Sequence, residues 1–391
     1  MLSKIEAGSE INERKYILFG NPAMRMAYPE DSIATVSING QEINIVPDTI
    51  KALSKVTISG SMFSDDGEKL TNYDGIITPT VFDKPSKITT FGHDQGSIPK
   101  TFYIQNNILY KGKAQITNGD FSFTFVVPKD IGYNYGFGKI SYYAKDNNSD
   151  ASGYYENIIV GGYDNNVIPD YTGPVIDLYM NDENFVFGGI TNENPDLLAL
   201  VSDDSGINTV GNGIGHDIVA ILDDNTENLY VLNDYYEADI NSYTSGIIRY
   251  PFSNLSEGLH NLSLKVWDVF NNSSTAYIEF FVTVSSEMAI EHLYNYPNPF
   301  VSGTGTSFVF EHNQANTNLE VQIQIFALSG QLVKTINTFV YTNGFRSDPI
   351  KWYGTNDNGS NVKKGMYIYR LLAKNPDGSF KEKRSKLVLM K

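Results

Sequence analysis

Apolar residues recur at every second position along much of this chain, and this period constrains the fold more than any other feature of the sequence. Phe121, Phe123 and Phe125, for example, alternate with Ser122 and Thr124. The same alternation recurs in the runs 262–266, 278–284 and 321–325. Successive side chains of a strand point to opposite faces, so each run predicts a strand with one buried and one solvated face. Such strands are typical of antiparallel sheets.

Turn signals separate these runs at short intervals. Asn-Gly or Asp-Gly pairs occur at 39–40, 66–67, 118–119, 343–344, 358–359 and 377–378. These pairs adopt the positive φ values that two-residue hairpins require. The chain also contains 26 Tyr and 22 Phe, which favour strands. No long amphipathic helical pattern follows residue 30. We therefore predict an all-β chain of tandem immunoglobulin-like β-sandwiches.

Three breaks divide the 391 residues into four segments. Residues 1–47 form a lead-in, the Gly- and Asn-rich stretch 161–166 predicts a linker, and the polar stretch 285–287 marks the third break. We predict a β-sandwich module at 48–165, an immunoglobulin-like β-sandwich at 166–285 and a last β-sandwich at 286–391. Each of these segments has the length of one sandwich domain.

Charge and composition exclude several classes of function. Acidic residues outnumber basic ones by 45 to 29, giving a net charge of −16, which argues against nucleic acid as a partner. Cysteine is absent, so disulfides, thiolate metal sites and a cysteine nucleophile are excluded from this chain. No run of apolar residues is long enough to predict a membrane-spanning helix. The first residues carry neither the basic patch nor the apolar run of a signal peptide.

The last segment carries an ordered set of motifs. It opens with Tyr-Pro-Asn-Pro-Phe at 296–300 and continues with Leu-Ser-Gly-Gln-Leu-Val at 328–333 and Trp-Tyr-Gly at 352–354. Asn-Gly at 358–359, Gly-Met-Tyr-Ile-Tyr-Arg-Leu at 365–371 and a basic end at Lys391 follow. In this order the motifs resemble the C-terminal sorting domain of proteins exported by the bacterial type IX secretion system. Tyr353 departs from the pattern, because the family usually has Asp or Asn there.

The resemblance implies that the last segment is recognised by an outer-membrane β-barrel shuttle protein. It also implies a location at the cell surface, associated with the outer membrane of a Gram-negative bacterium of the Bacteroidetes type. Six residues of the motifs are expected to serve sorting and docking and to take no part in catalysis: Pro297, Asn298, Pro299, Gly365, Tyr367 and Lys391. Proline would fix the entry of the strand, and Gly365 would allow a backbone conformation that a Cβ forbids.

Two further stretches resemble the sortase family of the same system, whose members are gingipain-type cysteine peptidases. One is 170–280, and the other is the lead-in at 19–29, which resembles the end of the peptidase domain. Asn21 stands where that family usually has Asp, and Met24 and Met26 stand where it has Leu. Residues 1–47 are therefore expected to be a remnant of an α/β peptidase domain. The catalytic Cys and His would lie upstream, so we predict a C-terminal fragment that is not itself an enzyme.

The resemblance further implies what the intact family does. It cleaves sorting domains from cargo and attaches the cargo to anionic lipopolysaccharide, in contact with other proteins of the surface attachment complex. Residues 48–285 would then act as spacer and docking modules. The alternative is a cell-surface adhesin, exported as cargo, whose immunoglobulin-like modules hold a glycan or a host protein. The lead-in at 19–29 favours the sortase, because an adhesin has no need of it.

An acidic group in the third segment is the candidate for a metal site. It comprises Asp203, Asp204, Asp217, Asp223 and Asp224. Carboxylate oxygens at the end of a sandwich can hold calcium, but the spacing fits no EF-hand loop. We expect these residues to form turns and we expect no cofactor, with structural calcium as the alternative.

Three other features of this segment have structural explanations. His216 beside Asp217 is expected to hydrogen-bond within a turn, because no nucleophile accompanies it. The glycine-rich stretch 211–215 leads into a strand pattern and is expected to be a loop, since a phosphate site needs a helix N-terminus. Trp267 is expected to end a strand as a core ring, with Asp268 capping the turn that follows.

Overall fold

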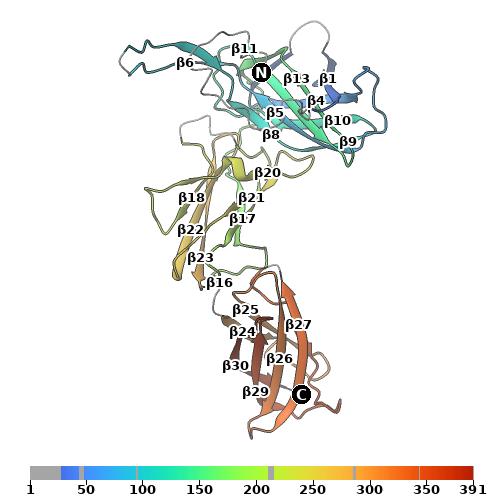
Figure 1. Ribbon diagram of the computed structural model, residues 1–391, viewed down its shortest axis with the longest axis vertical. Helices are drawn as coiled ribbons and strands as arrows, with labels where there is room; N and C mark the ends of the chain where they lie inside the picture. Colours follow the sequence, from blue (N-terminus) through green and yellow to red (C-terminus); the bar gives the residue numbers. More distant parts are fainter. Residues whose placement is uncertain are drawn as a thin grey trace, which may run out of the picture.

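The computed structural model describes residues 28–43, 48–93, 96–209, 215–284, 288–342 and 344–390. Within these ranges the secondary structure is almost entirely strand, with one short 3-10 helix, η2 (Asn233–Tyr235), and no α-helix. The predicted all-β fold of tandem sandwiches is confirmed. Three bodies follow one another along the long axis of the molecule (Figure 1). The peptidase remnant expected at 1–47 lies largely outside the described residues.

The first body, called here the first module, contains the strands from residue 31 to residue 163. They are β1 (Asp31–Ile38), β2 (Gln41–Glu42), β3 (Asp48–Ala52), β4 (Lys55–Phe63), β5 (Gly75–Phe82), β6 (Ser86–Thr89), β7 (Thr101–Ile104), β8 (Ile108–Lys111), β9 (Ala114–Thr117), β10 (Asp120–Val126), β11 (Gly136–Phe137), β12 (Lys139–Lys145), β13 (Asp150–Tyr155) and β14 (Ile158–Tyr163). A nine-stranded sheet runs β12-β13-β1-β4-β10-β9-β5-β8, with β2 beside β1. Because β12 pairs with β5 as well as with β13, the two layers of this module are joined along both edges.

The core of the first module is rich in stacked rings. The predicted alternation in β10 is confirmed, since Phe121, Phe123 and Phe125 are buried whereas Ser122 is exposed. Tyr110 stacks on Phe125, with ring centroids 4.8 Å apart. Offset stacking of this kind adds to the burial of apolar area, so the period of the strand sets both the inward direction and the ring contacts.

Two sequence expectations about this module need correction. Strand β1, which lies within the predicted lead-in 1–47, pairs with β4 in antiparallel register and belongs to the sandwich sheet. Gly161 and Gly162, predicted as part of a linker, are the last part of β14, which pairs with β3. At both glycines φ is positive, and a Cβ would lie within 3 Å of the 134–135 loop. Close backbone approach, rather than flexibility, explains this glycine pair.

The second module packs a four-stranded sheet, β15-β17-β21-β20, against a five-stranded sheet, β16-β23-β22-β18-β19. Its strands are β15 (Val175–Met180), β16 (Gly189–Thr191), β17 (Asp196–Ser202), β18 (Val219–Leu222), β19 (Tyr230–Val231), β20 (Tyr236–Ala238), β21 (Ser245–Pro251), β22 (Gly258–Trp267) and β23 (Ser273–Val282). The predicted alternations at 262–266 and 278–282 place their apolar residues in one core between the sheets.

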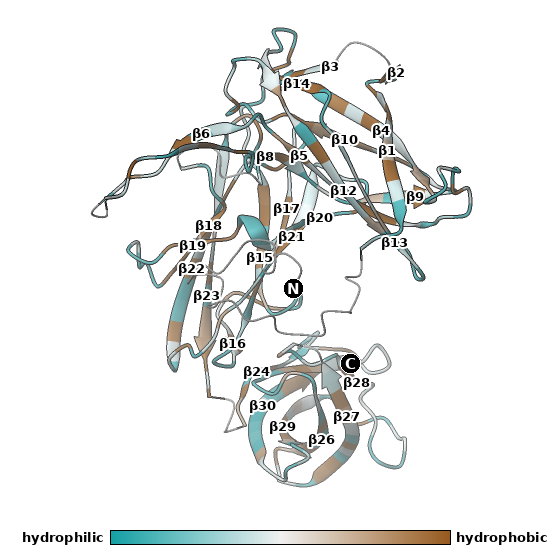
Figure 2. Cartoon of the chain, turned by 45° about the horizontal axis from the view of Figure 1, so that its top comes forward, coloured by the Kyte–Doolittle hydropathy of each residue, from teal (hydrophilic) through white to brown (hydrophobic). Residues whose placement is uncertain are grey.

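The C-terminal module is a seven-stranded sandwich. Its strands are β24 (Ile290–Tyr296), β25 (Thr306–His312), β26 (Thr317–Ala327), β27 (Leu332–Thr342), β28 (Ile350–Trp352), β29 (Gly365–Lys374) and β30 (Phe380–Leu389). One sheet has the order β24-β25-β28 and the other β27-β26-β29-β30. Seen nearly along its axis, this module curves into a ring around its core (Figure 2). A hairpin at 328–331, within the Leu-Ser-Gly-Gln-Leu-Val motif, joins β26 and β27, with Gly330 at a φ of 85°.

The first and second modules are joined by main-chain hydrogen bonds. Lys129 N–H donates to Val269 O and Asn241 N–H donates to Lys113 O, both at 2.9 Å. Gln115 N–H donates to Asn241 Oδ1, also at 2.9 Å. Contacts between backbones leave little freedom at this junction.

A buried carboxylate links the second module to the C-terminal module. Glu311 of β25 is only 5% exposed, and its Oε2 accepts hydrogen bonds from Ile190 N–H of the second module at 3.3 Å and from His292 Nδ1 at 2.7 Å. Arg346 donates to Asn184 O at 3.3 Å across the same junction. Gly344 is required here, because a Cβ on it would lie 1.5 Å from Asp182 Oδ2.

A search of the described residues for membrane-spanning helices finds none of sufficient length and apolar character.

Replacement of Phe125 by alanine should lower the free energy of unfolding of the first module by about 3–5 kcal/mol, because it leaves a cavity in a closed core. Chemical denaturation of the full chain measures the change. Ser122→Ala, on the outer face of the same strand, should alter it by less than about 0.5 kcal/mol. Similar losses for both variants would contradict the placement of this core.

Candidate functional site

The Tyr-Pro-Asn-Pro-Phe segment lies along the last strand of the chain. Asn298 extends its side-chain amide to the backbone of β30, where its Oδ1 accepts from Val388 N–H at 2.9 Å and its Nδ2 donates to Lys386 O at 3.1 Å. A side chain thus supplies the hydrogen bonds that a neighbouring strand would supply. This contact pairs part of the otherwise open edge of β30.

The backbone continues the same pairing at the next apolar residue. Phe300 N–H donates to Val388 O at 3.0 Å, and Met390 N–H donates to Phe300 O at 2.8 Å. The Phe300 ring is buried and lies 5.5 Å from the ring of Trp352. Pro297 O accepts from Thr306 Oγ1 at 2.8 Å, and the peptide bonds before both prolines are cis.

Gly365 and Tyr367 approach this cluster from β29. Gly365 begins the strand with a φ of 154°, which meets the expectation that its backbone takes a conformation disfavoured by a Cβ. Tyr367 is buried, its hydroxyl donates to Lys363 O at 2.5 Å, and its ring lies 6.5 Å from Trp352. Burial raises the pKa of the Tyr367 hydroxyl. Lys391 lies outside the described residues.

The motif residues therefore have two kinds of surroundings. Phe300, Trp352 and Leu389, which we did not predict as site residues, form the buried half. Their apolar character within the motifs was the signal available for them. The exposed half is made by Tyr296, which is 75% exposed, together with exposed Pro297 and Pro299. The buried half explains the fold, whereas the exposed half offers a rigid apolar surface for a partner.

Positive charge gathers on the strand beside this surface. β30 carries Lys381, Lys383, Arg384 and Lys386 against one acidic residue, Glu382, in a chain whose net charge is −16. Lys383 pairs with Glu291, and Arg384 pairs with Glu382 at 3.1 Å. The predicted basic end of the chain thus continues a basic strand.

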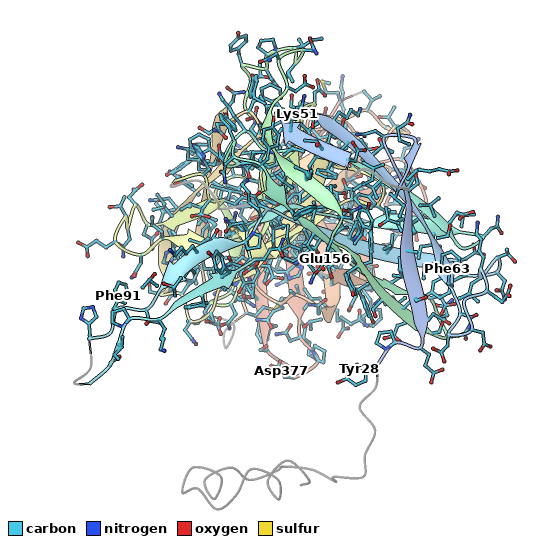
Figure 3. All side chains as sticks on the ribbon, turned by 90° about the horizontal axis from the view of Figure 1, so that it is seen from above. Tyr28, Lys51, Phe63, Phe91, Glu156 and Asp377 are labelled. Atoms are coloured by element: carbon cyan, nitrogen blue, oxygen red, sulfur yellow. The ribbon has the colours of Figure 1, made fainter. Side chains whose placement is uncertain are left out.

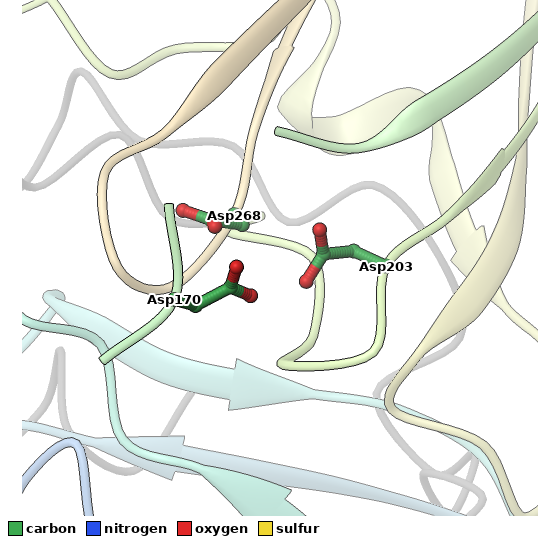
Figure 4. A group of neighbouring side chains, drawn as sticks. All are labelled: Asp170, Asp203 and Asp268. Atoms are coloured by element: carbon green, nitrogen blue, oxygen red, sulfur yellow. The ribbon is translucent and has the colours of Figure 1, made fainter. Parts of the chain in front are cut away.

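A second cluster lies at the end of the second module that faces the first. Asp170, Asp203 and Asp268 come from three separate segments and each offers an oxygen within 4.8 Å of the others (Figure 4). Of the five carboxylates considered for calcium, only Asp203 belongs to this group. Asp223 and Asp224 instead lie in an exposed turn beside Asn261, and Asp204 is exposed. The alternative considered from the sequence, a calcium site shared by these five carboxylates, is not formed in the described part of the chain.

Local hydrogen bonds account for the three clustered carboxylates. Asp203 Oδ1 accepts from Ser205 N–H at 2.8 Å and Gly206 N–H at 3.1 Å. Asp268 accepts from the backbone and the side chain of Asn272 at 2.6 and 2.7 Å, which confirms its predicted capping role. Carboxylates are common acceptors in such turns, and these contacts assign the group a structural role.

Burial and hydrogen bonding shift the pKa values of the three clustered carboxylates in different directions. Burial raises the pKa of Asp203 to about 6, assisted by the charges of Asp268 and Asp170. Burial also raises the pKa of Asp268. The hydrogen bond from Ser205, followed by that from Thr172, lowers the pKa of Asp170. The lowered pKa keeps Asp170 ionised, whereas the raised pKa values of Asp203 and Asp268 favour their protonated forms.

His216 forms a contact between modules instead of a turn within its own. Its Nδ1 lies 2.5 Å from Asp130 Oδ2 of the first module, and its ring packs against Trp267 at 4.5 Å. The expectation of a local turn hydrogen bond was wrong, because the imidazole bonds across the junction to the first module. This pair and the ring contact with Trp267 join the first and second modules.

Comparison with known proteins gives similarity in structure searches alone. No protein-family model matches the chain, and a comparison with curated proteins gives no match either. The chain is similar to dimeric latent PorU from Porphyromonas gingivalis, with 29% identity over 95% of this chain and 35% of that one, and a TM-score of 0.43. It thus spans about a third of the length of that protein.

Two other solved structures are similar at low identity. The fibronectin(III)-like modules of Clostridium thermocellum CbhA match 55% of this chain and 94% of theirs, with 8% identity and a TM-score of 0.22. Domains FN1–FN3 of chicken CNTN1 match 93% of this chain and 99% of theirs, with 9% identity and a TM-score of 0.21.

Asn298→Ala should expose the edge of β30, because both hydrogen bonds of the amide to that strand are lost. The C-terminal module should lose about 1–2 kcal/mol of stability, the usual range for such contacts. Hydrogen exchange should become faster at the amide of Val388. Asn318→Ala, at an exposed asparagine of the same module, is the control. Unchanged exchange at Val388 in the Asn298 variant would contradict the pairing.

The second module should become less stable as the pH rises from about 4 to about 6. In that range folded Asp203 retains a proton that the unfolded chain releases, so the folded state binds more protons and its advantage falls with increasing pH. With about 1.4 kcal/mol per pKa unit, the contribution is at most about 3 kcal/mol.

Thermal unfolding between pH 4 and pH 7.5 measures this effect. Asp203→Asn keeps an acceptor for Ser205 N–H but cannot ionise. It should be more stable than the parent chain at pH 7.5 and should flatten the profile. The explanation would be contradicted if the stability of the parent chain increased between pH 4 and pH 6 and if Asp203→Asn had the same pH profile as the parent chain.

Proposed function

We propose that this chain is the non-catalytic C-terminal part of a type IX secretion sortase. The C-terminal module would dock at the cell surface, and the two preceding modules would hold the upstream peptidase domain at a set distance. One observation carries the proposal. Phe300, Trp352 and Tyr367, which belong to three of the ordered motifs and lie far apart in sequence, meet in one cluster next to β30 in a single sandwich.

The surface of that edge supports a docking role. Tyr296, Pro297 and Pro299 are exposed apolar groups held on a backbone that Asn298 and Phe300 attach to β30. Preorganised apolar residues bind a partner at little cost in conformational entropy. The basic side chains of β30 would add attraction to an anionic partner at the outer membrane. The shuttle protein expected from the motifs would bind this combined surface.

The junctions support a spacer role for the two preceding modules. Main-chain hydrogen bonds join the first and second modules, and Glu311 joins the second to the third. The chain contains no cysteine, so the family's cysteine chemistry would reside in an upstream domain. Cleavage of sorting domains and attachment of cargo to anionic lipopolysaccharide would be activities of that longer protein.

A cell-surface adhesin exported as cargo is the second candidate. The observation that favours it is the concentration of exposed aromatic side chains on the first module, at Phe102, Tyr103, Tyr133, Tyr135 and Phe137. Reading the DNA upstream of Met1 separates the candidates. A gingipain-type domain with Cys and His supports the sortase, and its absence supports the adhesin.

Serine substitutions at Tyr296, Pro297 and Pro299 together should prevent surface display in a bacterium with a type IX system, because they remove the exposed half of the motif. The protein should accumulate in the periplasm, as it should when 286–391 is deleted. Surface labelling and fractionation measure the distribution.

The matched control replaces Phe339 and Tyr341, which are exposed on β27, by serine. This control should reach the surface, and thermal unfolding should show that both variants fold. Normal display of the triple variant, or equal retention of both, would contradict docking through the motif.

Purified residues 1–391 should not cleave peptides that carry a sorting domain, since the proposal places the nucleophile upstream. Mass spectrometry of the incubated peptides is the measurement. Cleavage that persists after repeated purification would disprove the assignment of this chain as non-catalytic.

A further inference from the structure

One end of the first module carries a groove of about 550 Å³ that the docking proposal does not use. Its walls include three exposed rings: Tyr103 of β7, 70% exposed, Tyr135, 64% exposed, and Phe137 of β11, 56% exposed. The hairpin of β6 and β7 projects from the body beside β11, with Phe91 near its far end (Figures 1 and 3). Exposed rings gathered at one groove mark a binding surface more often than a structural one.

A buried ion pair at the groove holds one of its walls, and the main chain of the same segment holds the other. Asp83 is 6% exposed and lies 2.9 Å from Lys84 Nζ. Lys84 Nζ also donates to Gly132 O at 2.7 Å, which holds the loop that carries Tyr135. Asp83 O accepts from Gln105 Nε2 at 2.9 Å, which holds the segment after Tyr103. Burial of an ion pair adds little net stability, but this one orients the wall that carries Tyr135.

The backbone of β14 supports the same loop from behind. A Cβ at Gly161 would lie 2.7 Å from Asn134 O, and a Cβ at Gly162 would lie 2.6 Å from the hydroxyl oxygen of Tyr135. The loop can lie this close only because both positions are glycine. The loop that carries Tyr135 is therefore positioned before any ligand arrives, which lowers the cost of binding.

The polar groups of the groove are suited to an uncharged ligand with many hydroxyls. The side-chain amides of Gln105 and Asn134 can each donate and accept hydrogen bonds, and Glu156 can accept them. The two charged residues that line the groove have opposite signs and each has a partner, Lys84 with Asp83 and Glu156 with Lys139 at 3.8 Å. This balance leaves no excess positive charge for a phosphate or a polyanion.

From this arrangement we propose that the groove binds a neutral oligosaccharide. Sugar rings would stack on Tyr103, Tyr135 and Phe137, and their hydroxyls would bond to the amides of Gln105 and Asn134 and to Glu156. A ligand with donors and acceptors on neighbouring carbons fits these groups better than a proline-rich peptide, whose backbone offers few donors. The volume lies within the range of about 300–1,000 Å³ of small-molecule sites. The proposal does not depend on the sortase assignment.

Isothermal titration calorimetry on the full chain tests it. The probes are maltohexaose, cellohexaose and mannohexaose as neutral oligosaccharides, hexagalacturonate as an acidic one and decaproline as a peptide. At least one neutral hexasaccharide should bind, and hexagalacturonate and decaproline should bind more weakly. Tyr103→Ala and Phe137→Ala should each weaken the binding by about tenfold or more, because each removes one stacking surface.

Controls separate loss of the site from loss of the fold. Phe137→Tyr keeps a ring and should restore the binding, and Tyr171→Ala removes an exposed ring outside the groove and should leave it unchanged. Thermal unfolding should be the same for all four variants. Failure of all three neutral probes, stronger binding of decaproline or hexagalacturonate, or equal weakening by Tyr171→Ala would each overturn the proposal. The Tyr103 and Phe137 variants should reach the cell surface normally. A failure of the docking proposal would therefore appear in surface display, whereas a failure of the oligosaccharide proposal would appear in calorimetry.

Discussion

The alternation of inward and outward side chains along antiparallel strands is the constraint on which the rest of this structure depends. With little helix in the described chain, each module has to enclose its core by bringing two sheet layers together. The first module does so with β12, which pairs on both sides, and the C-terminal module does so by curving its sheet. Strand edges and turns then become the places where polar side chains and recognition surfaces can lie.

Side-chain amides and carboxylates complete the backbone hydrogen bonding at these places. Asn298 takes the place of a strand beside β30, Asp268 closes a turn onto Asn272, and the Gln105 amide donates to the main-chain carbonyl of Asp83. In each case an acceptor oxygen pairs with a backbone or amide donor that would otherwise lose its bond to water. The many Asn and Asp residues thus contribute to the hydrogen bonding of strand edges and turns.

Much of the fold could be predicted because its determinants are local. The runs at 121–125, 262–266 and 321–325 show the two-residue period, and these residues are strands with alternating burial. The strand of β1 was missed, since its few apolar residues become buried only through pairing with β4 and β13. Gly161 and Gly162 were assigned to a linker because the reason for two glycines, a loop packed on them, lies 26 or more residues earlier in the sequence.

The candidate sites were less predictable, since they are assembled from distant segments. The motifs led to Pro297, Asn298 and Tyr367, but nothing local indicated that Asn298 would reach β30 or that Trp352 would join Phe300 and Tyr367. The carboxylates that meet are Asp170, Asp203 and Asp268, whereas the sequence suggested close neighbours. The aromatic groove combines side chains from four segments, and no single segment carries a signal for it.

The hydrogen bond from Ile190 N–H to Glu311 has a mechanical consequence. Breaking it would leave the buried Ile190 N–H without its acceptor, at a cost of about 1–3 kcal/mol, while Glu311 would keep its bond to His292. Bending at this joint is therefore resisted by desolvation as well as by sterics. The second and C-terminal modules should therefore keep their relative orientation when the C-terminal end of the protein is held. A force applied at one end would be transmitted through this junction, because hydrogen bonds join its two sides.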